Sequence, residues 1–432
     1  MGCVAIMRRG VVLSLAMMSA LASAHARAAE DSTLPSWLDV DVKGLIEARA
    51  ALTSNTKSWE DGGLGKVRWG SDSGAGVIAK PEGDLVVQPH FGFDWSGFVA
   101  LSANTQQRPA VDVQEAYLAY KSPPTSQFGL KARAGIFYPP VSLENEGLAW
   151  TSPYTITSSA INTWVGEELR TIGGEASLTW RPDEALDIAL TGSLFKFNDP
   201  AGTLLAWRGW TISDREVGIF DRVPLAPVRI IRPGATLDEQ AQSEEPYHEI
   251  DERFGYYAAA HLAAEDYGRL QVMRYDNRAD DRDLEYEQWA WWTRFWSAGY
   301  VAPEWLDFTF LAQYMTGTTT VITLPPPRTA IVYTDFWSAY ALVSKEWGRH
   351  RLSLRLEKFR TKDGDTFPDN NNERGTGVTA AYVFRPSDRQ RITLEVLRVD
   401  SDRPERVYLG FPAKAHETVV QASYRFFFGT GG

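Results

Sequence analysis

The sequence has one cysteine, Cys3, and no long apolar run outside its N-terminus. Cys3 precedes the N-terminal apolar run and lies within the segment that we expect to be removed. The mature chain would then have no thiol for disulfides, metal sites or nucleophilic catalysis. No stretch after residue 30 approaches the roughly 20 apolar residues of a membrane helix. Basic residues number 44 against 55 acidic ones, and no Lys/Arg cluster alternates with aromatics, so we expect no nucleic-acid partner.

The N-terminus has the pattern of an export signal. Arg8 and Arg9 precede the apolar run Val11–Leu21, and small residues follow in the alternating pattern of a cleavage site up to Ala28. We therefore predict a cleaved signal peptide over residues 1–26 and a single exported domain over residues 27–432.

After residue 35 the chain repeats segments of about ten residues in which apolar and polar side chains alternate. In one of them Leu352, Leu354 and Leu356 alternate with Ser353 and Arg355. A soluble sandwich would bury one face under a second sheet, whereas here the opposite face is repeatedly charged. The pattern predicts strands with one face in lipid and one in a wet lumen.

The predicted fold class is all-β, a transmembrane antiparallel β-barrel of about sixteen strands. The predicted strands span residues 36–50, 84–95, 97–105, 111–121, 128–138, 170–180, 186–197, 253–264, 269–276, 285–298, 305–316, 332–345, 351–360, 376–385, 391–399 and 417–428.

The connections alternate between tight turns and long polar loops. Turn residues occupy 181–184, 265–268, 345–350 and 385–388, whereas the gaps at 51–83, 139–169, 198–252, 361–375 and 400–416 are longer. This layout predicts short periplasmic turns, long extracellular loops and a location in the bacterial outer membrane. Two aromatic girdles are expected, with Trp95, Trp180, Trp305 and Tyr424 at the periplasmic side and Tyr138, Tyr286, Trp289 and Tyr314 at the outer side.

Two runs resemble a known family. Residues 113–120, VQEAYLAY, and residues 134–144, AGIFYPPVSLE, are similar to the phosphate-selective porins O and P. The resemblance implies a trimeric sixteen-stranded porin in which the loop over 139–169 folds inward to narrow the pore, with basic side chains guiding anions. The sequence departs from that pattern because residues 139–169 contain no Lys or Arg.

Barrels of sixteen to eighteen strands leave an aqueous channel, so we predict passive diffusion of small hydrophilic solutes, with anions such as phosphate as candidates. The candidate pore-lining and constriction residues are Lys131, Arg133, Glu144, Glu146, Arg294, Arg355 and Arg425. Predicted lumen-facing acids and bases balance, so they do not decide an ion preference. Two roles stay open for Glu144 and Glu146, which either contact solute or bond the loop to arginines of the wall. Arg355 has a second interpretation as a partner of Glu357.

The sequence leaves two alternative functions. A carbohydrate-selective porin would use tryptophans in the lumen, and an inward Arg294 would place Trp292 and Trp296 inside and Trp289 and Trp291 in lipid. An outer-membrane barrel enzyme is disfavoured because no nucleophile motif is evident.

We expect no catalytic residues, no cofactor and no metal site. The expected partners are small hydrophilic solutes, outer-membrane lipids and lipopolysaccharide, the barrel-assembly machinery, which would recognise the aromatic end at residues 424–428, and further copies of the chain in a homotrimer.

Overall fold

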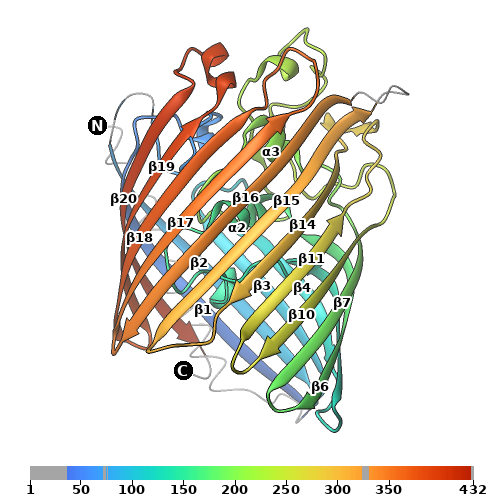
Figure 1. The fold of residues 1–432 in the computed structure, drawn as a ribbon, viewed down its shortest axis with the longest axis vertical. Helices are drawn as coiled ribbons and strands as arrows, with labels where there is room; N and C mark the ends of the chain where they lie inside the picture. Colours follow the sequence, from blue (N-terminus) through green and yellow to red (C-terminus); the bar gives the residue numbers. More distant parts are fainter. Residues whose placement is uncertain (1–36, 72–73, 75, 324–329, 430–432) are drawn as a thin grey trace.

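The computed structural model describes residues 37–71, 74, 76–323 and 330–429. The predicted signal peptide, residues 1–26, lies outside the described residues. The described chain forms a closed antiparallel barrel of sixteen strands, which Figure 1 shows from the side. The predicted fold class and strand number are confirmed.

Sequential strands are neighbours all the way around the wall, and β20 closes the barrel against β1. The wall strands are β1 (Leu38–Leu52), β2 (Val77–Phe91), β3 (Trp95–Asn104), β4 (Asp112–Lys121), β5 (Phe128–Phe137), β6 (Thr171–Asp183), β7 (Leu186–Lys196), β10 (Gly255–Ala264), β11 (Gly268–Asp276), β14 (Trp292–Val301), β15 (Phe308–Thr323), β16 (Ala330–Trp347), β17 (His350–Asp363), β18 (Glu373–Ser387), β19 (Gln390–Asp402) and β20 (Lys414–Gly429).

The long connections carry the remaining elements. These are the helices α2 (Ala160–Glu168) and α3 (Thr203–Trp207), the strand pair β8 (Val223–Pro224) and β9 (Ser243–Glu244), the strand pair β12 (Leu284–Glu285) and β13 (Gln288–Trp289), and short 3-10 turns at Trp59–Asp61, Leu148–Trp150, Arg229–Ile231 and Pro404–Leu409. Among the described residues, no helix combines the length and the apolar character needed to cross a bilayer.

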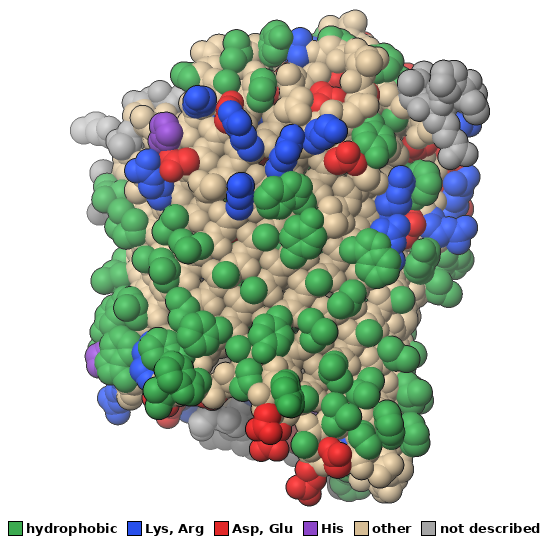
Figure 2. Space-filling view, in the orientation of Figure 1, with side chains coloured by type: hydrophobic (Ala, Val, Ile, Leu, Met, Phe, Trp, Pro, Cys, Tyr) green, Lys and Arg blue, Asp and Glu red, His purple; other side chains and the backbone are tan. Residues whose placement is uncertain are grey.

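Side chains alternate between the two faces of the wall as the strand period requires. On β17, Leu352, Leu354 and Leu356 are exposed on the outside, whereas Ser353 and Arg355 are buried inside. Figure 2 shows apolar side chains spread over the lower and middle parts of the outer wall. Such a surface is stable when acyl chains cover it, so the outer wall is the lipid-facing surface.

The two ends of the barrel differ. Strands are joined at one end by short turns such as residues 348–349, and at the other by long segments such as 138–170 and 197–254. The start of β1 and the end of β20 lie at the short-turn end (Figure 1). This arrangement agrees with the predicted periplasmic turns and extracellular loops.

The structure corrects two details. Tyr138 and Trp289 are only 4% and 9% exposed, so they do not belong to an outer girdle. Both lie in the long connections rather than on the lipid-facing wall, whereas the other predicted girdle residues are exposed on the surface. The predicted strand over 285–298 begins only at Trp292, because the preceding residues form the small β12–β13 pair.

Candidate pore and constriction

The segment between β5 and β6 folds into the barrel interior and carries α2. Every residue of α2 is buried, and the hydroxyl of its N-cap Ser159 accepts a hydrogen bond from the backbone N–H of Asn162. Trp164 packs edge-on against Phe295 of β14 and Phe336 of β16, with ring centroids 5.5 and 5.3 Å apart. The structure thus places residues 139–169 in the lumen, against the wall.

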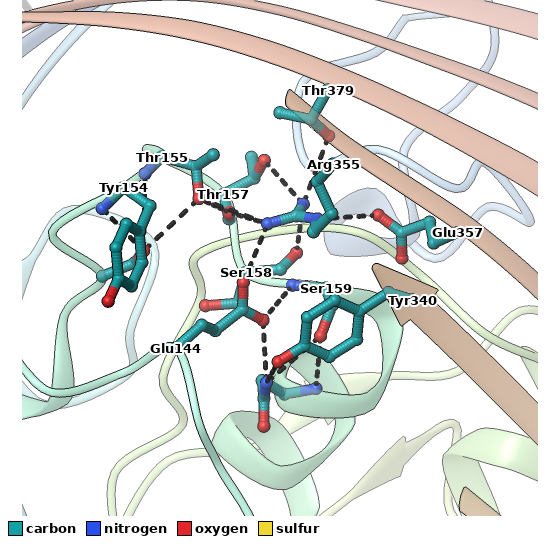
Figure 3. Close-up of polar contacts among 12 residues, drawn as sticks. Glu144, Tyr154, Thr155, Thr157, Ser158, Ser159, Tyr340, Arg355, Glu357 and Thr379 are labelled. Atoms are coloured by element: carbon teal, nitrogen blue, oxygen red, sulfur yellow. Dashed lines mark hydrogen bonds and ion pairs between the residues drawn. The ribbon is translucent and has the colours of Figure 1, made fainter. Parts of the chain in front are cut away.

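Arg355 of β17 is the centre of the anchor that holds this segment (Figure 3). Its side chain is fully buried and forms ion pairs with Glu144 of the segment at 3.1 Å and Glu357 of the wall at 3.0 Å. It also donates to the carbonyl oxygens of Thr157 at 2.7 Å and Ser158 at 2.9 Å. These contacts hold the segment against β17, because removing one member of a buried ion pair leaves the other charge buried without compensation.

Two wall carboxylates bind the backbone of the same segment. Glu357 accepts from the N–H of Ala160 at 2.7 Å, and Glu395 of β19 accepts from the N–H of Ile156 at 2.6 Å. Glu395 also accepts from the hydroxyl of Thr157 at 2.7 Å. Charge-assisted bonds of this kind are about twice as strong as neutral ones, so the segment is fastened along β17 to β19.

The segment over 197–254 also enters the interior, although the sequence analysis treated residues 198–252 as an outer loop. Leu204 and Trp207 of α3 are buried, and Trp207 packs against Trp291 with ring centroids 4.8 Å apart. Arg208 forms an ion pair with Glu167 of α2, and burial raises the pKa of Glu167 to about 7. The apolar residues of α3 explain the inward fold, because exposing them to water would be unfavourable.

The connection between β1 and β2 contributes a third inward piece. Lys66 is fully buried, forms an ion pair with Glu373 of β18 and donates from Nζ to the carbonyl of Arg208 at 2.7 Å. Burial lowers the pKa of Lys66 to about 7. The extracellular part of the lumen is therefore filled by three packed segments.

A narrow polar cavity of about 50 Å³ remains between these segments and the wall. Asp84 of β2 and Glu216 of the 197–254 segment line it, and the Tyr138 hydroxyl donates to Glu216 at 3.1 Å. Arg68 and Arg425 line it from other sides. This space holds only a few water molecules.

Toward the periplasmic ends of four adjacent strands, four arginines face the lumen, and one of them, Arg425, also lines this cavity. They are Arg351 of β17, Arg385 of β18, Arg391 of β19 and Arg425 of β20. Arg391 lies directly opposite Arg425 in the strand register, and like charges in that position are destabilising. Glu346 pairs with Arg351 and Arg385, whereas Nε of Arg391 has no hydrogen-bond partner among the described residues.

The predicted pore residues fall into different environments. Lys131 is exposed and takes part in no ion pair among the described residues, whereas Arg133 is paired with Glu175 at 2.8 Å. Glu146 forms an exposed pair with Arg269 at 3.2 Å.

Arg425 pairs with Glu47 of β1 at 2.7 Å while lining the cavity. Of the two roles left open for Glu144, the structure shows the second: the buried carboxylate bonds the loop to the wall arginine Arg355.

The prediction for Arg294 is wrong. The inward residues of β14 are Thr293, Phe295 and Ser297, all less than 5% exposed, while Trp296 is 53% exposed on the outside. Arg294 shares the outward parity of Trp296. The hydroxyl of Thr293 donates to the carbonyl of Ala201, so small inward residues here make room for the 197–254 segment.

The predicted positions of the tryptophans are reversed as well. Trp296 lies outside, and Trp291 is fully buried rather than in lipid. Trp292 stacks with Arg294 at 3.9 Å from guanidinium carbon to ring centroid, on the outward face.

Sequence reasoning missed Arg351, Arg385, Asp84 and Glu216. The two arginines lie next to tight turns at the periplasmic end, where the alternating pattern is too short to show which face a residue occupies. Continuing the every-second-residue alternation of β17 and β18 by one more inward position reaches Arg351 and Arg385, which identifies both as inward. Asp84 and Glu216 are brought together only by the inward fold of a distant segment, for which the sequence has no local signal.

Comparison with solved structures finds outer-membrane channels. The outer membrane channel DcaP of Acinetobacter baumannii superposes with a TM-score of 0.57 at 10% identity, covering 91% of this chain and 99% of that one. An anion-selective porin from Comamonas acidovorans and OprB from Pseudomonas putida each give a TM-score of 0.47 at 9% identity, covering 90% of this chain and 100% and 94% of theirs.

No family model and no curated protein sequence matches the chain. At such low identity the likeness to solved structures is one of fold. That fold is the one found in outer-membrane porins, and with the lipid-facing wall it supports the predicted location in the bacterial outer membrane. The resemblance to the phosphate-selective porins stays a prediction.

Proposed function

We propose that the chain is a porin through which small hydrophilic solutes diffuse passively, with a preference for anions such as phosphate. The observation that carries the preference is the direct opposition of Arg391 and Arg425 across β19 and β20. Two cations held side by side cost stability, and of the two only Arg425 has an ion pair among the described residues, with Glu47. They are useful where a passing anion supplies the missing charge.

The surrounding charges support this proposal. Arg351 and Arg385 share the single carboxylate of Glu346, and Arg425 shares Glu47 with Arg49. The four arginines Arg351, Arg385, Arg391 and Arg425 thus have two carboxylate partners, Glu346 and Glu47, and Arg49 also pairs with Asp214. A low-dielectric wall lined by one sign of charge focuses the field and raises the local concentration of counter-ions. The periplasmic part of the lumen would thus attract anions to the narrow cavity above it.

The alternative of a carbohydrate channel has less support. A sugar path needs aromatic faces along the lumen, whereas Trp296 lies on the outer wall and Trp291 is packed against Trp207. The homotrimer and recognition by the assembly machinery remain predictions from the sequence.

Single-channel recording in planar bilayers tests the proposal. In a salt gradient we expect small conductance steps, because the interior is narrow, and a reversal potential that reports anion preference. Arg391→Glu should shift that reversal potential toward cation preference. A matched control is Arg398→Glu, which makes the same change on the outer face of the same strand, where Arg398 pairs with Asp400 at 3.1 Å.

Three results contradict the proposal. These are a cation-selective wild-type channel, an unchanged reversal potential in Arg391→Glu, and equal shifts in Arg391→Glu and Arg398→Glu. Block of the current by neutral sugars at concentrations that leave phosphate without effect would favour the carbohydrate channel instead.

A further inference from the structure

The outer wall has a groove near its extracellular end that the channel function does not use. It encloses about 450 Å³ across β11 to β17. Its floor is formed by the short side chains of Thr316 and Thr318 on β15, and Trp296 and Trp337 stand on the flanking strands. Short residues between long ones make a depression in an otherwise even wall.

Four basic side chains line this groove, which we call the outer-wall basic groove. They are Arg274 of β11, Arg294 of β14, and Arg360 and Lys362 of β17, and the groove has one acid, Asp335 of β16. Figure 2 shows basic side chains gathered along the upper part of this face, above the apolar belt. The positive charge is thus concentrated at one height on the wall.

One of the four cations, Arg274, pairs with Asp276 at 3.6 Å. The other three, Arg294, Arg360 and Lys362, have no ion-pair partner among the described residues, whereas the nearby Arg374 and Arg398 are paired with Asp402 and Asp400. Arg360 and Lys362 are exposed and Arg294 is partly exposed, so these unpaired cations can reach an acceptor from outside the protein.

The apolar surface directly below the groove indicates what supplies that acceptor. On β17 the outward residues change from Leu352, Leu354 and Leu356 to Lys358, Arg360 and Lys362 within one strand. This step marks the level at which acyl chains give way to headgroups. At the extracellular end of the barrel, the lipids at this level are those of the outer leaflet. The acceptor for the groove is therefore expected on an outer-leaflet lipid that has both acyl chains and anionic headgroup phosphates.

We propose that the outer-wall basic groove binds the phosphate groups of a phosphorylated outer-leaflet glycolipid, lipopolysaccharide, while its acyl chains lie on the leucines below. Arg294, Arg360 and Lys362 donate to the phosphate oxygens, and arginine presents a planar fork that matches them. Trp296 and Trp337 flank the sugar headgroup at the level where aromatic side chains favour the interface.

Binding to purified lipopolysaccharide, measured by native mass spectrometry of the folded barrel in detergent micelles, tests the proposal. We expect the wild-type protein to retain the glycolipid. The triple variant Arg294→Gln, Arg360→Gln and Lys362→Gln should bind roughly 100-fold more weakly, since each basic residue near an anionic lipid surface contributes on the order of 1 kcal/mol. Enzymatically dephosphorylated glycolipid should bind the wild type as weakly as the intact glycolipid binds this variant.

A matched control variant removes three other basic residues of the same end. Arg374→Gln, Arg398→Gln and Lys414→Gln changes the net charge equally, but these residues lie outside the groove. This control should keep near wild-type binding. Both variants should keep the gel mobility of a closed barrel, which separates loss of the lipid site from misfolding. Both should also keep an unchanged channel conductance, which separates this proposal from the proposed porin function.

Four outcomes overturn the proposal. They are equal binding by the groove variant and the wild type, equal loss in both triple variants, equal binding of dephosphorylated glycolipid, and binding of inorganic phosphate as tight as that of the glycolipid. A groove variant that changes only the oligomeric state would instead assign this surface to a second copy of the chain.

Discussion

The two parts of the barrel interior differ in what fills them. Toward the extracellular end, buried side chains of three inward segments pack against the wall, and charges such as Arg355 and Glu144 are paired and inaccessible. Toward the periplasm, Arg351, Arg385 and Arg391 remain partly exposed. For the proposed porin we therefore expect the loops to set the width of the path and the wall arginines to set the ion preference.

This division explains why the segment over 139–169 needs no basic residues. Its own acid, Glu144, binds the wall arginine Arg355, and the wall acids Glu357 and Glu395 bind its backbone N–H groups. The segment acts as a structural barrier whose charges are used in fastening it. The ionic character of the path then comes from strands β17 to β20, which are rigid and hold their side chains in fixed positions.

The largest effect is expected when the fastening itself is broken. Arg355→Ala leaves Glu144 and Glu357 buried without their partner, which costs about 3–5 kcal/mol in comparable pairs. The segment should detach from β17, and single-channel conductance should rise with frequent switching between levels. Arg398→Ala, on the outer face of β19, is the control and should keep the wild-type conductance. Unchanged conductance and thermal stability in Arg355→Ala would show that the anchor is not needed for the narrow state.

A smaller effect is expected from the titration of Glu216 at the narrow cavity. Burial raises the pKa of Glu216 to about 7, against the opposing influence of Arg170 and the Tyr138 hydroxyl. The carboxyl is therefore neutral below about pH 7 and negative above it, so anion preference should fall as the pH rises through 7. One charge about 8 Å from a passing ion is worth about 1 kcal/mol at intermediate dielectric, or roughly fivefold in the permeability ratio.

Reversal potentials measured between pH 5.5 and 8.5, a range of about 1.5 on either side of that pKa, check this expectation. Glu216→Gln should show the low-pH selectivity throughout. Asp84 and Glu115 lie near the same carboxyl, so a pH dependence that persists unchanged in Glu216→Gln would assign the titration to one of them.

Most of the wall could be predicted from sequence because its signal is local. Each strand repeats the in-and-out alternation, so β17 and β19 were recognisable from Leu352 and Ile392 onward, and the chain order determines which strands pair. Parity failed at β14, because Trp292 and Trp296 on the strand and Trp289 and Trp291 before it offer apolar residues to both faces. There the tertiary contact between Thr293 and Ala201 decides which face is inward.

The interior could be predicted only in part. Glu144 was recognised as a candidate partner for a wall arginine, because an acid in an inward segment needs a cation. The close approach of the two acids Asp84 and Glu216, and the ion pair of Lys66 with Glu373, depend on how three long segments pack together. Neither hydrophobic period nor turn chemistry specifies that packing, so these residues had no signal in the sequence.

The smallest effect is expected at Glu146, which is close to Glu144 in the chain but not in environment. Its pair with Arg269 spans 3.2 Å with both side chains about half exposed, and exposed pairs contribute about 0–1 kcal/mol. Glu146→Gln should leave conductance and thermal stability nearly unchanged, whereas Glu144→Gln, which weakens the pair with Arg355, should lower stability and raise conductance. Measuring both variants side by side compares the same Glu→Gln substitution at a buried and at an exposed position. Equal effects in the two would mean that the segment is held by its apolar contacts, with Trp164 rather than Arg355 as the main fastening.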